Sequence, residues 1–405
     1  MKILLLGQGF DPEPGFKGLS FARELVARGH EVEVLTGFPN YPGGQVYPGY
    51  RIRPWAREQI EGIAILRVAL YPSHNKSALG RIINYASFAV SAAFIGTALI
   101  KKPDVLYVYC PPATIGLPAV ALSILRNVPY VIDICDLWPD TVKASGMLSS
   151  PVALWLLGEW CKFVYRCADH IVVVSPGFKH RLVSRGVPPA KIDLVHNWCD
   201  ETSIHPTPPN PELATRLGLS GAFNVMFAGM MGTAQALDSV LLAAAMCRHT
   251  LPNAQFVFVG GGVDRDRLKE KAEAMGLTNT RFLPRQPMSA MGDIIALADL
   301  LLVHLKDDPL FRITIPSKTQ AYMASGKPIL MAVRGDAAQL VTESGAGLVC
   351  EPENPADIAE AVARFAAMSP EERRIMGQAG RQFYIEQLSL KLGVNKFEKI
   401  FSRIR

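Results

Sequence analysis

Short apolar runs recur along the chain and alternate with longer segments of mixed polarity. In the first half, apolar runs of this kind predict buried strands at residues 2–6, 31–35, 105–110, 130–134, 171–174 and 192–195. Between them, amphipathic segments such as residues 19–28 predict helices, and Gly29 follows the last helical position. Strands that alternate with helices predict parallel sheets covered by helices, which is an α/β fold.

The pattern is interrupted by a proline-rich stretch at residues 204–218 and then starts again. Strands are predicted beyond it at residues 224–227, 255–259, 281–283, 300–305 and 328–333. A chain of 405 residues suits two domains. We therefore predict two Rossmann-like, doubly wound domains at residues 1–203 and 222–384, facing one another across a cleft. A linker at 204–221 and a C-terminal helix within 385–405, packed back on the first domain, complete this interpretation.

One carboxylate, Asp136, directly follows the predicted strand 130–134. Ligands of open α/β sheets bind at the carboxyl ends of the strands, so Asp136 is a candidate catalytic base or orienting group. Because aspartate also suits a turn near Pro139, a purely structural role is the alternative.

Two glycine-containing loops follow the first two strands. The first carries Gly15, Lys17 and Gly18 but does not match the GxGxxG fingerprint of dinucleotide sites. The second, residues 37–50, is rich in Pro, Gly and Tyr and includes Asn40 and Tyr41. It is either a rigid surface loop or a loop that binds an acceptor substrate.

The segment at residues 298–330 predicts a strand, a polar loop, a helix and a second strand. Ser317 is the expected N-cap of this helix, and the loop before the helix contains Arg312. A helix N-terminus with unpaired N–H groups can bind an anion, and Lys318 would add positive charge. A second N-terminus of this kind is expected at Gly232, before a helix that starts near Ala236.

Charge and cysteine content exclude several classes of protein. The seven cysteines form no CxxC pair, and no histidine cluster has ligand spacing, so we expect no structural metal and reduced thiols in the cytosol. The first 200 residues carry a net charge of +5 and the remainder +1. This diffuse excess suits an acidic membrane surface or a phosphate-bearing ligand, but not nucleic acid. The apolar run at the start is too short for a signal peptide.

Residues 82–100 contain no charged side chain. This length approaches that of a membrane span, but a buried helix and a helix at the membrane interface are the other two interpretations. Similar apolar helices are predicted at 117–125 and 155–164. Basic residues near these segments would face anionic headgroups if the domain docks on a membrane: Arg81, Lys101, Lys102, Arg126, Lys162 and Arg166.

Several sequence motifs together resemble the family 4 retaining glycosyltransferases, which have the GT-B fold. They are FARELVARGHEV at 21–32, CDLWPDTV at 135–142, ADHIVVVSPG at 168–177, HNWCD at 196–200, FAGMMGTAQALDSVL at 227–241, VGGG at 259–262 and PSKTQAYMASGKPIL at 316–330. The DLWP and GFPNYPGG elements are similar to the branch that includes N-acetylfucosaminyl transferases of bacterial surface polysaccharide assembly.

The resemblance implies a metal-independent, retaining transfer of a sugar from a UDP-sugar to a polyprenyl-diphosphate-linked acceptor. An N-acetylated hexosamine or deoxyhexosamine is the implied sugar, and O-antigen, capsule or exopolysaccharide is the implied product. Such an enzyme would be cytoplasmic and peripheral at the inner face of the plasma membrane. Beside the catalytic candidate Asp136, the expected acceptor-binding residues are Asn40, Tyr41 and Trp138. The expected donor-binding residues are Gly15, Lys17, Gly18, Gly232, Thr233, Gln235, Arg285, Arg312, Ser317, Lys318 and Gln320.

The chain also departs from the family pattern. The positions of the family's two donor-site glutamates hold Ile313 and Ala321. Its phosphate-binding Arg and Lys correspond to Met230 and Gln235, and Cys135 stands where a histidine is frequent. Two alternatives therefore remain beside an active transferase: a catalytically silent GT-B partner protein that binds nucleotide or glycan, and a nucleotide-sugar 2-epimerase.

Overall fold

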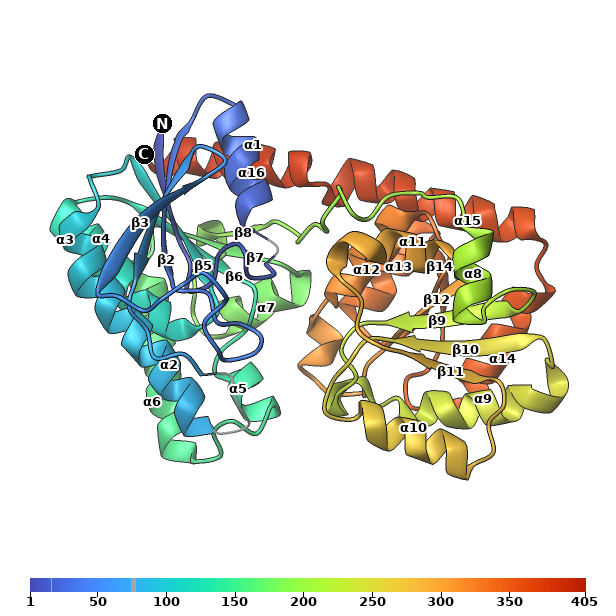
Figure 1. Ribbon diagram of the computed structural model, residues 1–405. Helices are drawn as coiled ribbons and strands as arrows, with labels where there is room; N and C mark the ends of the chain where they lie inside the picture. The colour runs from blue at the N-terminus through green and yellow to red at the C-terminus, as the bar shows by residue number, and fades with distance from the viewer. Residues whose placement is uncertain (16, 74–77) are drawn as a thin grey trace. The chain divides into compact units, whose positions relative to one another are not determined.

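The computed structural model describes residues 1–15, 17–73 and 78–405. They form two compact units (Figure 1): unit 1 comprises Met1–His196 with Gly393–Arg405, and unit 2 comprises Asn197–Leu392. Each unit is built on one sheet with helices on both faces, so the predicted pair of Rossmann-like α/β domains is confirmed. The chain passes from one unit to the other twice, after His196 and after Leu392.

The first passage lies earlier in the chain than the predicted linker at 204–221. Ile204 and Leu219 are buried in a core of unit 2, and helix α8 spans Pro211–Leu217 between them. The prolines here shape structure instead of marking a free linker. Pro211 occupies the first turn of α8, where its missing N–H is not needed, and the side chain of Asn210 caps that turn.

The sheet of unit 1 has eight strands in the order β3-β4-β2-β1-β5-β6-β7-β8, and all its pairings are parallel except β3 with β4. The strands are β1 (Lys2–Leu6), β2 (Glu31–Gly37), β3 (Trp55–Ile60), β4 (Ile63–Val68), β5 (Val105–Cys110), β6 (Tyr130–Ile134), β7 (His170–Val173) and β8 (Ile192–Leu194). The hairpin of β3 and β4 was not predicted from the sequence. It turns at Glu61 and Gly62, which both have positive φ, a combination typical of two-residue hairpin turns.

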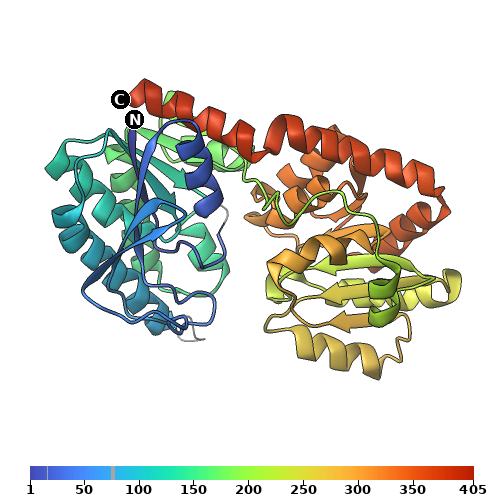
Figure 2. The same ribbon diagram turned by 45° about the horizontal axis from the view of Figure 1, so that its top comes forward.

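Right-handed crossovers decide which face of this sheet each helix covers. The helices of unit 1 are α1 (Leu19–Ala27), α2 (Ala78–Ser91), the π-helical η1 (Ala92–Gly96), α3 (Thr97–Leu99), η2 (Ala113–Ile115), α4 (Gly116–Arg126), α5 (Asp140–Ala144), α6 (Pro151–Cys167), α7 (Pro176–Ser184), η3 (Pro189–Lys191) and α16 (Leu390–Ile404). α1 leads from β1 to β2, toward the β3 edge of the sheet, whereas α2, α4 and α6 lead toward the β8 edge. α1 therefore covers one face of the sheet, and α2, α4 and α6 cover the other (Figures 1 and 2).

The C-terminal helix α16 contributes to unit 1 from Gly393 onward. The ring of Phe397 lies 5.3 Å from the ring of Phe21 in α1 and 5.3 Å from that of Tyr107 in β5. Both chain termini lie in this unit, close together (Figure 2).

The sheet of unit 2 has six parallel strands in the order β11-β10-β9-β12-β13-β14. The strands are β9 (Phe223–Ala228), β10 (Ala254–Val259), β11 (Thr280–Leu283), β12 (Leu300–His304), β13 (Ile329–Ala332) and β14 (Gly347–Val349). The remaining helices are η4 (Thr233–Gln235), α9 (Asp238–Thr250), α10 (Arg265–Ala274), η5 (Met288–Ala290), α11 (Met291–Ala296), η6 (Phe311–Ile313), α12 (Ser317–Ser325), α13 (Asp336–Ser344), α14 (Pro355–Ala367), α15 (Pro370–Phe383) and η7 (Tyr384–Leu388).

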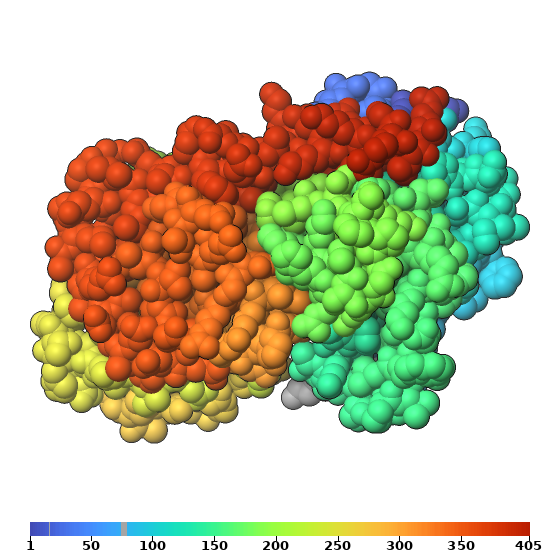
Figure 3. All heavy atoms as spheres, turned by 180° about the vertical axis from the view of Figure 1, so that it is seen from behind, coloured from blue at the N-terminus to red at the C-terminus, as the bar shows by residue number. Residues whose placement is uncertain are grey.

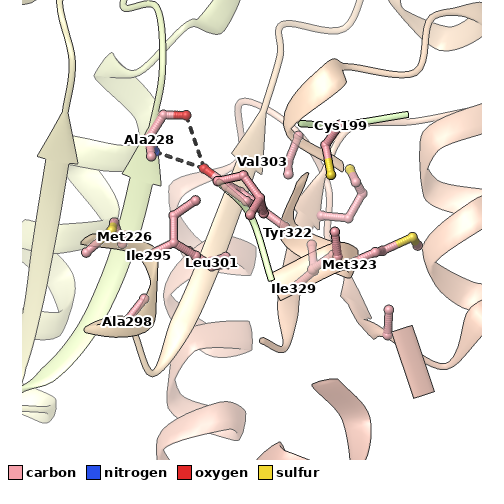
Figure 4. Close-up of a cluster of buried hydrophobic side chains, with 14 of the residues drawn as sticks. Cys199, Met226, Ala228, Ile295, Ala298, Leu301, Val303, Tyr322, Met323 and Ile329 are labelled. Atoms are coloured by element: carbon pink, nitrogen blue, oxygen red, sulfur yellow. Dashed lines mark hydrogen bonds between the residues drawn. The ribbon is translucent and has the colours of Figure 1, made fainter. Parts of the chain in front are cut away.

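Alternate residues of these strands belong to two separate hydrophobic cores. Phe227 and Leu302 belong to one core, while Ala228 and Val303 belong to the other. In the second core, the hydroxyl of Tyr322 on α12 accepts from Ala228 N at 2.9 Å and donates to Ala228 O at 3.2 Å (Figure 4). These bonds fasten α12 to the end of β9.

Each sheet has one position where the chain reverses the direction in which strands are added. In unit 2 this position lies between β9 and β12, and in unit 1 between β1 and β5. Loops that leave two such neighbouring strands diverge to opposite faces, and the crevice between them is the usual ligand site of this fold.

Candidate functional site

Two glycine loops lie in direct backbone contact at the carboxyl edge of the unit 2 sheet. Residues 229–232 follow β9 and residues 260–262 follow β10. The N–H of Met231 donates to Gly261 O at 2.7 Å. A Cβ at Gly260, where φ is +136°, would lie 2.1 Å from Gly229 O, and one at Gly262, where φ is +141°, would lie 2.2 Å from Met231 O. Only glycine fits at these two positions.

The N–H of Gly232 is bonded within the protein. The side-chain oxygen of Gln235 accepts from Gly232 N at 3.0 Å, and Gln235 O is 2.7 Å from Nδ1 of His304. Burial lowers the pKa of His304, whose Nε2 accepts from Glu353 N at 3.0 Å. Thr233 begins a 3-10 turn of three residues, and the long helix α9 starts at Asp238. The prediction of a free helix N-terminus at Gly232 is therefore wrong.

Helix α12, in contrast, begins without a side-chain cap. Its N-cap is Pro316 and not Ser317 as predicted, and no side chain of the described residues caps its first turn. Proline has no hydroxyl to accept from them, which leaves this end of a nine-residue helix available to a ligand. Gln320 is buried and its amide nitrogen is placed to donate to Pro316 O and Ser317 O, so it supports the first turn from within.

Lys318, in the first turn of α12, carries the most informative side chain of unit 2. Its ammonium nitrogen is buried and has no hydrogen-bond partner among the described residues. The nitrogen lies 3.4 Å from the ring centre of Phe227. It also lies 3.4 Å from the position that a Cβ would take at Gly229. Burial lowers the pKa of Lys318 to about 7. The ammonium thus lies beside the carboxyl end of β9.

The two arginines predicted for the donor site are placed differently. Arg312 forms a two-pronged ion pair with Asp307 at 2.7 and 2.8 Å and is about half exposed. Arg285 is exposed and follows β11, the edge strand, which is separated from β9 by β10. In the described part of the chain, no hydrogen bond connects the Lys318 ammonium with a group of either arginine.

In unit 1, Lys17 is not a surface cation. Its ammonium is ion-paired with Asp133 in the middle of β6, and both side chains are fully buried. The hydroxyl of Tyr107 donates to the same carboxylate at 2.6 Å. A carboxylate in a buried strand requires a counter-charge, and Lys17 supplies it. The prediction that Lys17 contacts the donor is therefore wrong.

The N-terminus of α1 is also occupied. The carboxylate of Asp11 accepts from Leu19 N at 2.7 Å, and a Cβ at Gly18 would lie 2.3 Å from that carboxylate. Gly18 is therefore required for this internal cap, which corrects its predicted role in donor binding. Gly15 is exposed and has open space around its Cα.

A buried polar network joins two loops and helix α2 at the carboxyl edge of the unit 1 sheet. The carboxylate of Glu13 accepts from Asn40 N at 2.5 Å and from Tyr41 N at 2.6 Å. Asn84 of α2 donates to Asn40 Oδ1 at 3.2 Å and accepts from Gln8 at 2.5 Å. Burial raises the pKa of Glu13 above its usual range. The network fixes the loop of Asn40 and Tyr41 against α2.

Asp136 lies near this network. It is partly buried, burial raises its pKa to about 6, and it accepts no hydrogen bond from the described residues. Tyr85 of α2 lies within electrostatic reach of Asp136, Tyr41 and Arg81, which all affect the pKa of its hydroxyl, although burial is the main cause of its rise. The ring of Trp138 is 6.1 Å from that of Tyr85, edge to face. Asp136, Tyr41 and Trp138 therefore gather around Tyr85.

Glu13, Asn84 and Tyr85 were not among the site residues predicted from the sequence. Asn84 and Tyr85 stand inside the uncharged segment 82–100, and a polar side chain in such an apolar helix was the available signal. Glu13 gave no signal because a carboxylate in a glycine-containing turn is usually exposed.

Comparison with known proteins adds to this geometry. The Glycosyl transferase 4-like domain family matches residues 19–198, and the Glycosyl transferases group 1 family matches residues 217–383. These two matches cover most of both units. The chain is a glycosyltransferase of the family 4-like, GT-B type.

Individual relatives agree with this assignment. The glycosyltransferase is 28% identical to a protein named as the colanic acid biosynthesis glycosyl transferase WcaI of Escherichia coli, over 80% of this chain and 82% of that one. It is 25% identical to a protein named as glycosyltransferase WbjE of Pseudomonas aeruginosa, over 72% and 74%. Among solved structures, Anabaena HepE in complex with UDP-glucose is similar with a TM-score of 0.72 and 15% identity, covering both chains fully.

Two further findings bear on the predicted departures from the family pattern and on metal binding. The positions at which the family resemblance implies two glutamates hold apolar side chains here. Ala321 is partly buried and packs against the core of unit 2, and Ile313 lies in η6. In the described part of the chain, no three His, Cys, Asp or Glu side chains are arranged to hold a metal ion.

Proposed function

We propose that this glycosyltransferase takes its sugar from a nucleoside diphosphate sugar, UDP-linked, whose diphosphate binds at the N-terminus of α12. The observation that carries this proposal is the buried ammonium of Lys318. Within residues 1–15, 17–73 and 78–405 it has no hydrogen-bond partner, and the helix end beside it has no side-chain cap. A buried cation without a counter-charge is costly, so a ligand anion would both satisfy it and be held by it.

The surroundings of Lys318 suit a diphosphate. Gly229 has no side chain between the backbone and the Lys318 ammonium, which lies 3.4 Å from where its Cβ would be, and the N–H groups of α12 point along the helix axis toward the same end. A helix N-terminus contributes up to about 2 kcal/mol to binding an anion in partly buried geometry. The remainder must come from Lys318, because Met230 replaces the arginine that the family resemblance leads one to expect. The complex of Anabaena HepE with UDP-glucose supports a donor of this class.

The same groups would assist the chemistry. When the sugar leaves the donor, negative charge grows on the diphosphate oxygens, and fixed N–H groups with a buried ammonium stabilise it without reorganisation. Asp136 would orient the acceptor hydroxyl or the donor sugar from unit 1, since its carboxylate accepts no hydrogen bond from the described residues. We assign the reaction as a retaining transfer without a metal cofactor.

For the acceptor we propose a polyprenyl-diphosphate-linked saccharide at the inner face of the plasma membrane. Tyr85, which is half-buried, supplies an aromatic surface against which a sugar ring can pack, and the buried Trp138 supports its ring edge to face. Asn40 lies on the adjoining loop. The name of WcaI, which refers to colanic acid, supports a role in surface polysaccharide synthesis. The implied sugar is an N-acetylated hexosamine or deoxyhexosamine.

The test is a panel of nucleotide sugars incubated with purified protein and extracted lipid-linked acceptors, with UDP release and product mass as readouts. We expect UDP release that depends on both donor and acceptor and that is lost in Lys318→Ala. Donor binding without turnover on any acceptor would favour the silent partner protein suggested by Ile313 and Ala321. Conversion of the donor sugar without any acceptor would identify an epimerase.

A further inference from the structure

The outer surface of three helices in unit 1 has an unusual composition. Between Leu79 and Leu99, on α2, η1 and α3, all the exposed positions are apolar: Leu79, Ile82, Ile83, Ala86, Val90, Phe94 and Ala98. They recur every three or four residues and therefore form one continuous helical stripe. A helix on the surface of a soluble domain normally has polar residues at these positions.

The neighbouring helices extend the same surface. The exposed positions of α4 are Leu117, Ile124 and Leu125, and those of the first half of α6 include Val152, Trp155 and Leu156. Crossover handedness places all three helices on one face of the sheet, with α4 in contact with both α2 and α6. Figure 3 shows the cyan to green segments that contain α4 and α6 at the surface of unit 1. We call this set of exposed residues on α2–α3, α4 and α6 the apolar face.

The charges around the apolar face have one dominant sign. The three helical segments and the loop that follows α3 hold six basic residues and two acidic residues, Asp104 and Glu159. Lys101 and Lys102 are exposed beyond Leu99, and Arg166 is exposed near the end of α6. Both acidic residues already have partners: Glu159 is paired with Lys162 at 2.6 Å, and the carboxylate of Asp104 accepts from Lys2 N at 2.8 Å. Excess positive charge beside exposed apolar side chains matches the surface of a bilayer that contains anionic lipids.

The segment does not have the environment of a membrane span. By length and composition, Leu79–Leu99 is the one described helix that could cross a bilayer. However, its inner side packs on the sheet: Phe88 and Ala92 are fully buried, and a Cβ at Gly96 would lie 2.6 Å from Leu35 of β2. Removing this helix from the unit would expose the core beneath it, so it is placed to lie on a membrane and not to cross it.

We propose that the apolar face inserts into the surface layer of an anionic phospholipid bilayer. This inference rests on the proposed function, because membrane insertion of the apolar face would bring the proposed lipid-linked acceptor to Tyr85 and Asp136. The first turns of α2 and α6 lie at the carboxyl edge of the sheet, the same edge as Asp136, so Ile82 and Trp155 would enter the membrane beside the site.

The direct test is sedimentation with sucrose-loaded vesicles of phosphatidylcholine alone or mixed with phosphatidylglycerol. We expect binding to the mixed vesicles, weakened by salt, and a loss of about tenfold or more in the double variant Phe94→Glu with Ile124→Glu. Both side chains are more than two-thirds exposed, at 74% and 71%, so folding should be retained. The matched control is Leu242→Glu with Ile375→Glu, exposed apolar residues of unit 2, which should bind as the unmodified protein does.

Trp155 gives a second readout that needs no charge change. Its side chain is 63% exposed, and we expect its fluorescence to shift to shorter wavelength with mixed vesicles. Trp155→Phe should remove this shift while vesicle binding persists.

Absence of binding to mixed vesicles would overturn the proposal, and so would unchanged binding of the Phe94→Glu with Ile124→Glu variant. An unchanged Trp155 fluorescence spectrum in protein that sediments with the vesicles would also overturn it. A dimer that this variant dissociates, without vesicle binding, would assign the face to a second copy of the chain. Vesicle binding without any UDP release would leave the surface intact and refute the proposed function instead.

Discussion

The ammonium of Lys318 lies 3.4 Å from the ring centre of Phe227, with no hydrogen-bond acceptor among the described residues. An aromatic face offers a cation much less stabilisation than a carboxylate or phosphate does. The pair is therefore informative about function, since the protein keeps a costly charge at the end of β9 where a ligand can neutralise it.

Removing this charge should weaken donor binding. We predict that Lys318→Ala lowers the affinity for UDP and for the UDP-sugar alike by about tenfold or more, equivalent to about 1.4 kcal/mol. Lys318→Arg should recover part of the loss, because the charge persists while its geometry changes. Isothermal titration calorimetry would measure all three proteins. Unchanged UDP affinity in Lys318→Ala would place the diphosphate elsewhere.

The same lysine should make donor affinity depend on pH. Its pKa of about 7 in the free protein means that, as pH rises above 7, binding an anion must increasingly be accompanied by proton uptake. The affinity for UDP should thus fall as pH rises from about 7, until the pKa of the complex is passed. Lys318→Arg, whose guanidinium stays protonated, serves as control and should lack this decline.

Stability should change in the opposite direction. A pKa lowered from the usual 10.5 to about 7 means that the unfolded chain binds more protons between these values, so the stability contributed at Lys318 rises with pH across that window. Lys318→Met should therefore raise the Tm of the ligand-free protein near neutral pH, by an amount that shrinks as pH approaches 10.5. A Tm advantage that grows with pH would contradict this account.

Asp136 offers a comparable separation of activity from stability. If its ionised carboxylate orients a substrate, Asp136→Asn should lower turnover by about a hundredfold or more, and the activity of the unmodified protein should decline as pH falls through about 6. Because burial raises this pKa, ionisation destabilises the folded state above it, and the Asn variant should be more stable by on the order of 1–3 kcal/mol at neutral pH.

A residue that only shapes the turn before Pro139 would behave differently. Its replacement would leave turnover near that of the unmodified protein, with no change in the pH profile. Steady-state kinetics across pH, paired with thermal melts, distinguish these two cases.

The glycine loops of unit 2 allow a prediction with a control from the same motif. Gly260→Ala would place a methyl group 2.1 Å from Gly229 O at a φ of +136°, so we expect unit 2 to lose about 2 kcal/mol or more of stability. Gly261→Ala meets nothing within 4 Å and should change stability by less than about 1 kcal/mol. Urea unfolding of the two variants measures the difference, and equal losses would mean that the loops part more readily than their packing indicates.

Much of the fold could be predicted from the sequence, since strands buried on both faces are mostly apolar along their length. β5 and β6 match their predicted bounds, because Asp104 and Pro129 interrupt the chain directly before their first residues. The β3–β4 hairpin was missed because β3 is an edge strand and mixes polar with apolar residues. The linker was placed wrongly because prolines end regular structure whether or not the chain is free beyond them, and Ile204 is buried.

The candidate site was predictable only in part. Sequence position made Asp136 and Lys318 candidates, because Asp136 follows the predicted strand 130–134 and Lys318 stands in the first turn of a predicted helix. It could not show that Lys17 pairs with Asp133, a contact across 116 residues, nor that Tyr85 joins Asp136. Whether a lysine has a counter-charge inside the protein depends on tertiary contacts, and these cannot be read from a single sequence.

The contact between the two glycine loops has a consequence for the timing of substrate capture. Gly229 N donates to Val259 O and Met231 N to Gly261 O, so the amides of the first loop are already engaged in the empty protein. Such amides exchange with solvent deuterium only when the surrounding sheet opens. The floor of the crevice is thus complete before any nucleotide arrives, and slow exchange at Met231 without donor would record that readiness.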